Sequence, residues 1–272
     1  MSTVSLPVRY CELNPPTRVP WREENFELKT MTQKIDPAEA ALVMVDVWDI
    51  HPYQSHLERG AEITEKRIVP VAQACREAGI AVVHAPSPGQ APKYSQWVRY
   101  AGDREMGVAG GTASDNWPPP EFRSRNGKYA KLAKPKSARR EKWLKEKLPE
   151  RRIMSCMEPQ PEDFVIHNGD QLHRLLRHRK ILHLFYAGFA ANMCVLHRDY
   201  GIVAMQRRGY NIVLLRDCTT AIESGETLPH MTHTKASISI VEMVFGGTAT
   251  SAELIKACKA SRKKTRRRSK RT

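Results

Sequence analysis

Short continuous runs of apolar residues alternate along this chain with longer stretches in which polar and apolar residues are mixed. The apolar runs lie at 40–47, 80–85, 163–167, 181–188 and 210–217. Runs of this length are typical of strands that are buried on both faces. The mixed stretches have the length and polarity of helices and lie at 60–79, 170–179, 193–208 and 233–245. A short strand and a last helix are expected over 248–258.

This alternation of strand and helix, with short connections, predicts a parallel sheet with right-handed crossovers. The expected fold class is therefore α/β, with a doubly wound, Rossmann-like sheet. Residues 39–258 form the expected domain, and a long loop-and-helix insertion at 86–160 interrupts its alternation. Residues 1–38 are polar and contain prolines, so we expect an extended arm that lies over the domain.

The net charge of +15 is concentrated in two segments. Residues 259–272 contain nine Lys or Arg and no acidic residue, and residues 123–152 contain thirteen basic residues against three acidic ones. The rest of the chain is therefore slightly acidic. The final segment has no apolar residue except alanine, so we expect it to be disordered. It is either a weak contact for polyanions such as nucleic acids or a solvated tail without a partner.

Composition excludes several classes of protein. A hydrophobic fraction of 41% rules out wholesale disorder, and no apolar run reaches the ~20 residues that span a bilayer. The N-terminus lacks the basic start and apolar stretch of a secretory signal, and the six cysteines form no C-x-x-C pair. We therefore expect a cytoplasmic protein without a disulfide framework, a cofactor or a membrane partner.

Three polar or reactive features fall at the ends of predicted strands. They are Asp46 after the first strand, His167 and Asn168 after the third, and the turn GFAANMC, residues 188–194, after the fourth. Sites in open α/β sheets lie at the carboxyl ends of the strands. This convergence indicates an enzyme that acts on a small molecule.

Cys194 lies a few residues beyond the end of a predicted strand, in the first turn of a predicted helix. The unpaired N–H groups and the dipole of a helix N-terminus lower the pKa of a thiol and favour the thiolate. The small residues Gly188, Ala190 and Ala191 would let a ligand approach the backbone, where two N–H groups could hold an oxyanion. The alternative is that Cys194 is a small buried side chain without a chemical role.

Asp46 ends an apolar run, so its carboxylate is withdrawn from water. Such a group must be hydrogen-bonded, paired with a charge or functional. It is either a base that takes the proton of a thiol or a residue that caps a neighbouring loop.

Two segments resemble the isochorismatase-like cysteine hydrolases, the superfamily that includes nicotinamidases and N-carbamoylsarcosine amidases. ALVMVDVWD is similar to the first strand of that family with its terminal aspartate. GFAANMCVLHRDYGIVAMQRRGYNIVLLRDCTTAIE is similar to its G-x-A-T-x-x-C-V signature with the helix and strand that follow. The similarity covers 40–85 and 163–255. It implies a six-stranded parallel sheet that often assembles into dimers or tetramers, so we expect a homo-oligomer.

The resemblance also implies roles for residues. Cys194 would be the nucleophile and Asp46 its general base. The peptide bond between Phe189 and Ala190 would be cis and would turn the Ala190 N–H toward the oxyanion. The implied reaction is attack of the thiolate on a small amide or ureide, release of ammonia or an amine, and hydrolysis of the thioester.

The sequence departs from the family pattern at two positions. Ala191 replaces the signature threonine, and Asn168, or His167 after a shift of one residue, stands where the family has a catalytic lysine. We assign Asn168 to the catalytic set, although an amide supplies no charge. The candidates for a substitute cation are three lysines of the insertion, Lys128, Lys131 and Lys134. The alternative function is a catalytically impaired family member that binds a ligand or is tethered to nucleic acid.

A cluster of aromatic and imidazole side chains follows Asp46. We interpret Trp48, His51 and His56 as substrate-binding residues. A metal bound by the two histidines is the alternative. The D-x-H motif that holds the nicotinamidase metal is represented here by His84 alone, so no metal is expected.

Overall fold

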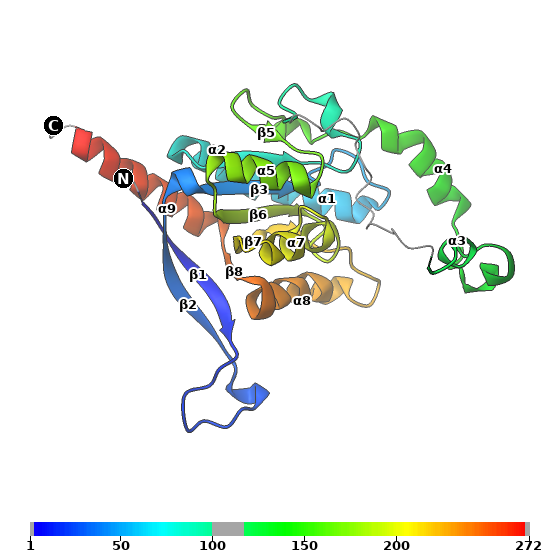
Figure 1. Cartoon of the computed structure of the whole chain (residues 1–272), viewed down its shortest axis with the longest axis horizontal. Coiled ribbons are helices and arrows are strands. Elements are labelled where there is room, and N and C mark those ends of the chain that lie inside the picture. The colour runs from blue at the N-terminus through cyan, green and yellow to red at the C-terminus, as the bar shows by residue number, and fades with distance from the viewer. Residues whose placement is uncertain (1–2, 100–116, 270–272) are drawn as a thin grey trace.

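The computed structural model describes residues 3–99 and 117–269, which are arranged around one sheet (Figure 1). Within this part of the chain the sheet has eight strands in the order β2-β1-β8-β7-β6-β3-β4-β5. Those from β8 to β5 run parallel to one another: β3 (Ala40–Val45), β4 (Ala81–Ala85), β5 (Phe164–Val165), β6 (His183–Phe189), β7 (Asn211–Thr220) and β8 (Gly247–Ala249). The predicted α/β class with a parallel sheet is confirmed.

The other two strands, β1 (Val4–Glu12) and β2 (Glu27–Ile35), form an antiparallel hairpin. This hairpin adds to the sheet beside β8 and extends away from the body of the molecule (Figure 1). The arm predicted for residues 1–38 is therefore a pair of strands and not an extended cover. Val4, Leu6 and Val8 are buried and alternate with more exposed positions. This alternation has the two-residue period of a strand.

Helices cover both faces of the sheet. One face carries α1 (Gln54–Ile63), α2 (Val69–Ala78) and α9 (Ser251–Ser269). The opposite face carries α5 (Gly169–Arg179), α6 (Cys194–His197), α7 (Ile202–Arg207) and α8 (Thr232–Ile240). Leu42 and Met44 of β3 pack with the first group, whereas Ala41, Val43 and Val45 pack with the second. This explains the continuous apolar run of β3, since both of its faces are buried.

Shorter turns connect these elements. Short segments of 3-10 helix lie at Glu23–Asn25, Pro37–Glu39, Ala91–Lys93, Gly127–Leu132, Leu148–Glu150, Ser155–Met157 and Leu228–His230. Turns of π-helix lie at Thr64–Ile68 and Val241–Phe245. Among the described residues, no helix combines the length and the apolar character needed to cross a bilayer.

The helix predicted over 193–208 is interrupted between α6 and α7. Arg198 has an extended backbone, with φ −61° and ψ 157°. Gly201 packs so closely against the end of α6 that a Cβ at this position would meet two carbonyl oxygens at 2.9 Å. The break matters for the site because it directs the side chain of Arg198 to Asp46.

The insertion contains α3 (Pro120–Arg123) and α4 (Ala138–Lys147), which stand away from the sheet in Figure 1. Its last residues return to the body. Ile153 pairs with Trp48 in an antiparallel bridge, and the Met154 N–H donates to the Val47 carbonyl. This return brings Arg151 to the carboxyl end of β3.

The basic segment predicted to be disordered over 259–272 is helical as far as Ser269, where α9 ends. Leu254 and Cys258 bury the first turns of this helix in the core. Lysine, arginine and alanine are good helix formers, so the helix continues beyond its packed turns. Residues 270–272 lie outside the described part of the chain.

Candidate active site

Asp46 follows β3 and lies at the carboxyl end of that strand with 1% of its surface exposed. Its φ of 50° is unusual for a residue other than glycine, but aspartate tolerates it. Ser87 Oγ donates to Oδ1 at 2.7 Å, and Arg198 Nη2 donates to Oδ2 at 3.3 Å. Both oxygens thus have a donor, which fixes the orientation of the carboxylate.

Cys194 begins α6, and the Asp46 carboxylate acts on its thiol. Burial raises the pKa of the Cys194 thiol to about 12, and the negative charge of Asp46 adds to this effect, whereas Arg198 acts against it. The lowered thiol pKa expected at a helix N-terminus is therefore wrong, since α6 has only four residues and its dipole is outweighed. At neutral pH the thiol therefore keeps its proton.

The end of β6 brings backbone to the sulfur. The peptide bond between Phe189 and Ala190 is cis, and a hydrogen bond with the backbone of Ala190 acts to lower the thiol pKa. Gly188, with φ 109°, lies against β3 so closely that a Cβ would collide with the Val45 carbonyl oxygen. A glycine is required here because β3 and β6 must approach closely, which places the carboxylate and the sulfur side by side.

Two arginines supply the positive charge of the site. Arg198 pairs with Asp46, and Arg151 Nη1 donates to Ser87 Oγ at 3.2 Å, so Ser87 links the second guanidinium to the same carboxylate. Burial alone would lower the pKa of Arg198, but the adjacent Asp46 raises it above its ordinary value. Burial lowers the pKa of Arg151, yet a guanidinium stays charged at neutral pH.

The positive charge beside Asp46 does not come from the residues that the sequence suggested for the position of the family lysine. Asn168 caps α5, where its Oδ1 accepts from the Gln171 N–H at 2.9 Å. The buried His167 donates its backbone N–H to the Gln171 side chain, and burial lowers the pKa of its imidazole. Among the described residues, no hydrogen bond or ion pair joins Asn168 to Asp46 or Cys194, because its amide is used by the helix cap. Three lysines of the insertion lie exposed, Lys128, Lys131 and Lys134.

Sequence reasoning missed both arginines. Arg198 lies four residues after Cys194, within the segment that carries the family resemblance, and its nearness to the cysteine was the available signal. Arg151 is one of thirteen basic residues in 123–152, and no local pattern distinguishes it from the others.

The three predicted substrate-binding residues lie together beside the cis peptide. The rings of Trp48 and His51 are stacked at 4.7 Å, those of His51 and His56 lie 5.1 Å apart, and Trp48 lies 5.7 Å from Phe189. Burial lowers the pKa of His51 and of His56 to about 4, and nearby positive charges add to the effect. Both imidazoles are therefore neutral at neutral pH. Within the described ranges, no group of three or more His, Cys, Asp or Glu is suited to hold a metal ion.

Two cavities flank this cluster. One of about 500 Å³ is lined by residues that include His56, Arg59 and Met193, the neighbour of Cys194. The other, of about 470 Å³, lies between His51 and the arginine-bearing helix α4 of the insertion. A small molecule therefore has room on either side of the imidazoles.

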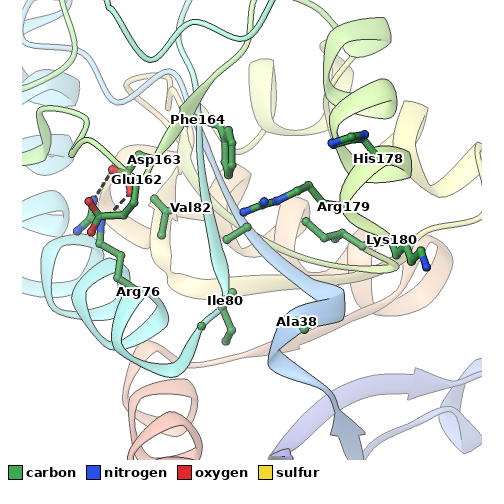
Figure 2. A pocket seen from close by; sticks show the side chains of 13 residues that line it. Ala38, Arg76, Ile80, Val82, Glu162, Asp163, Phe164, His178, Arg179 and Lys180 are labelled. Carbon is green, nitrogen blue, oxygen red and sulfur yellow. Dashed lines mark hydrogen bonds and ion pairs between the residues drawn. The ribbon is translucent and has the colours of Figure 1, made fainter.

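A further cavity of about 530 Å³ lies at the opposite edge of the sheet, where β4 begins (Figure 2). Its Arg76 is held by Asp163, with an Nη2–Oδ2 distance of 2.6 Å. His84 makes a hydrogen bond of 2.9 Å with the same carboxylate. Hydrogen bonds from Arg76 and His84 outweigh burial and hold the pKa of Asp163 well below its usual range. This cluster is structural and lies apart from Cys194, since it joins α2 and β4 to the residue before β5.

A buried acid beside a thiol, at the carboxyl ends of adjacent parallel strands, defines a class of α/β enzyme with a cysteine site. A family model described as "Isochorismatase domain" matches residues 40–253. The chain therefore belongs to the isochorismatase family of hydrolases.

Three solved structures are similar to this chain. A cysteine hydrolase from Pseudomonas syringae pv. phaseolicola matches with a TM-score of 0.57 and 18% identity, over 84% of this chain and 95% of that chain. An N-carbamoylsarcosine amidase from Thermoplasma acidophilum matches with a TM-score of 0.43 and 17% identity, over 78% and 96% of the two chains. A nicotinamidase/pyrazinamidase from Bacillus subtilis matches with a TM-score of 0.43 and 19% identity, over 78% of this chain and 99% of that chain. The first of these shows that the fold is shared. A comparison with curated proteins found no match.

Proposed function

We propose that this protein is a cysteine hydrolase that cleaves the C–N bond of a small amide or ureide. The observation that supports the proposal is that the buried Asp46 carboxylate acts on the half-buried Cys194 thiol, with the Ala190 backbone at the same sulfur. A thiol with a pKa of about 12 needs a base at the moment of attack, and Asp46 is the acidic group in contact with it.

In the proposed mechanism, Asp46 removes the thiol proton as the Cys194 sulfur attacks the carbonyl carbon of the substrate. The developing oxyanion accepts hydrogen bonds from the backbone N–H groups of Ala190 and Cys194. Asp46 then returns the proton to the leaving nitrogen, the C–N bond breaks, and an acyl thioester remains on Cys194. A water that gives its proton to Asp46 hydrolyses the thioester and restores the thiol.

The test is a panel of small amides and ureides assayed for release of ammonia, with mass spectrometry of the Cys194 peptide after rapid quenching. We expect at least one substrate to release ammonia and to leave an acyl group on Cys194. If no member of the panel acylates Cys194, the proposed function is wrong.

Arg198 is expected to hold Asp46 in position as the cation of the site. Replacing it in Arg198→Met removes a charge-assisted hydrogen bond of about 1.5–3 kcal/mol, so kcat should fall roughly 10- to 100-fold. Arg198→Lys should recover part of the loss, since it restores the charge but not the planar fork. The matched control is the exposed Arg207 on α7, where Arg207→Met should leave kcat unchanged. Equal kcat in Arg198→Met and wild type would contradict this role.

Alkylation of Cys194 by iodoacetamide should be slow at pH 7 and should rise about tenfold per pH unit to at least pH 10. The thiolate fraction grows in this way at any pH below the thiol pKa of about 12. Free cysteine, with a pKa of about 8.5, levels off well before pH 10 and is the reference. Site-resolved mass spectrometry measures the rate. A plateau below pH 9 would show that the thiolate is stabilised and the raised pKa is wrong.

A second candidate function is contact with polyanions through α9. The observation that favours it is that one continuous helix carries the basic segment beyond the packed core, at the edge of the molecule (Figure 1). Deleting residues 264–272 removes six basic residues and leaves the packed turns in place. Affinity for a DNA duplex at low salt should fall at least about tenfold, with a shallower salt dependence. Unchanged affinity would remove this candidate, and hydrolase activity should not change in either case.

A further inference from the structure

The guanidinium of Arg151 is buried with incomplete pairing. The residue is 9% exposed, and its Nη1 makes a hydrogen bond to Ser87 Oγ. Its Nε is fully buried and has no hydrogen-bond partner among the described residues, and no carboxylate there forms an ion pair with it. A buried charge is costly unless it is paired. Part of this guanidinium is therefore left for a group that is not in the protein.

The charges around Cys194 also indicate that the site can accept a negatively charged group. Asp46 is the carboxylate that acts on the thiol, and it faces two guanidiniums, those of Arg151 and Arg198. Asp49 also acts on Arg151, but its Oδ1 accepts the backbone N–H of Arg152. The Arg198 Nε is likewise buried without a partner among the described residues. With the thiol protonated, the centre of the site carries an excess of positive charge.

The position of Arg151 suits the binding of an anion beside the reacting atoms. Its guanidinium lies over the ring of Trp48, with 5.7 Å to the ring centroid, so a flat aromatic surface supports it. Ser87 Oγ lies 3.2 Å from Arg151 Nη1 and 2.7 Å from Asp46 Oδ1, so the guanidinium lies close to the carboxylate that acts on Cys194. The edge of a guanidinium formed by Nε and an Nη matches the two oxygens of a carboxylate.

We propose that the substrate is an anionic amide or ureide, and that Arg151 binds its carboxylate while Cys194 attacks its amide carbonyl. This inference rests on the proposed function and adds the substrate class to it. The carboxylate supplies the partner that Arg151 lacks and balances the charge of the site. The inference makes Arg151 a residue that determines specificity, whereas Arg198 positions Asp46.

Binding can be measured without turnover in the Cys194→Ala variant. The probes are malonamate, succinamate and glutaramate, which place a carboxylate at three distances from an amide, and the corresponding neutral diamides. By calorimetry we expect at least one carboxylate to bind roughly 10- to 100-fold more tightly than its diamide. Adding Arg151→Gln should remove that difference. The matched control is Arg152→Gln, because this neighbouring side chain is 49% exposed, and the preference should survive there.

The outcomes separate the inference from the proposed function. Equal affinity for the carboxylate and the diamide, or a preference that survives Arg151→Gln, overturns the inference. Tighter binding of phosphonoacetamide than of malonamate would overturn the assignment to a carboxylate. If the wild-type enzyme hydrolyses the neutral diamides as fast as the carboxylates, the substrate class is wrong but the hydrolase stands. If carboxylates bind through Arg151 and no substrate acylates Cys194, the proposed hydrolysis fails and the anion site remains.

Discussion

Replacing Cys194 with alanine is expected to lower kcat roughly 10⁴-fold or more, because the variant has no atom that can form the thioester. Substrate affinity should change little, since Asp46, Ser87 and both arginines keep their hydrogen bonds to one another. The measurement is ammonia release by the variant and the wild type with the best substrate of the panel.

The matched control for this prediction is Cys156→Ala. Cys156 is exposed in the 3-10 turn Ser155–Met157, so its replacement should leave kcat within a factor of about two. Cys194→Ser is a stricter variant, because it keeps the shape of the side chain but offers a hydroxyl in place of the more acidic thiol. It should remain far below wild type. Substantial activity in Cys194→Ala would assign the chemistry to another nucleophile.

The sheet could be predicted from the sequence because its signal is local. The strand β3 reads as a continuous apolar run, since one set of its residues faces α2 and α9 and the other faces the helices on the opposite side. Glycine at 79 marks the end of α2, where it adopts φ 83°. The hairpin of β1 and β2 was missed because its prolines and charged residues masked an alternation that buries only one side.

The site could be predicted only where chemistry and chain position coincide. Asp46 and Cys194 each follow a strand, and neighbouring parallel strands bring their carboxyl ends together. The cation depends on tertiary structure. Arg151 reaches the site because the insertion returns to pair with Trp48, and Arg198 reaches it because the chain breaks after α6. Neither event leaves a periodic signal in the sequence.

The thiol pKa shows why the sequence alone misjudged the electrostatics. A helix N-terminus lowers a thiol pKa, but α6 is a single turn of four residues, so its dipole is small. Burial and the charge of Asp46 act over the same distance in the opposite direction and raise the pKa to about 12. In the proposed mechanism, the sulfur is therefore activated by proton transfer during the reaction and not by a thiolate that is already present in the resting enzyme.

Asp46→Asn is expected to lower kcat by roughly 10²- to 10⁴-fold, which is the range for loss of a general base. The substitution suits the local structure, because asparagine also tolerates the φ of 50° and its amide oxygen can still accept from Ser87. Thermal unfolding should confirm that the variant is folded. Asp49→Asn is the control, since Asp49 accepts a backbone N–H of Arg152 and should leave kcat within a few-fold.

The same variant separates a base from a residue that only shapes the site, because two measurements should move in opposite directions. Asp46 raises the thiol pKa, so its neutralisation lowers that pKa and increases the thiolate fraction at pH 8. Iodoacetamide needs the thiolate alone, and its reaction with Cys194 should therefore become faster while hydrolysis becomes slower. Amide hydrolysis still fails because no group remains to carry the proton to the leaving nitrogen. A parallel fall of both rates would mean that Asp46 only maintains the structure, and the assignment of the base would then have to be abandoned.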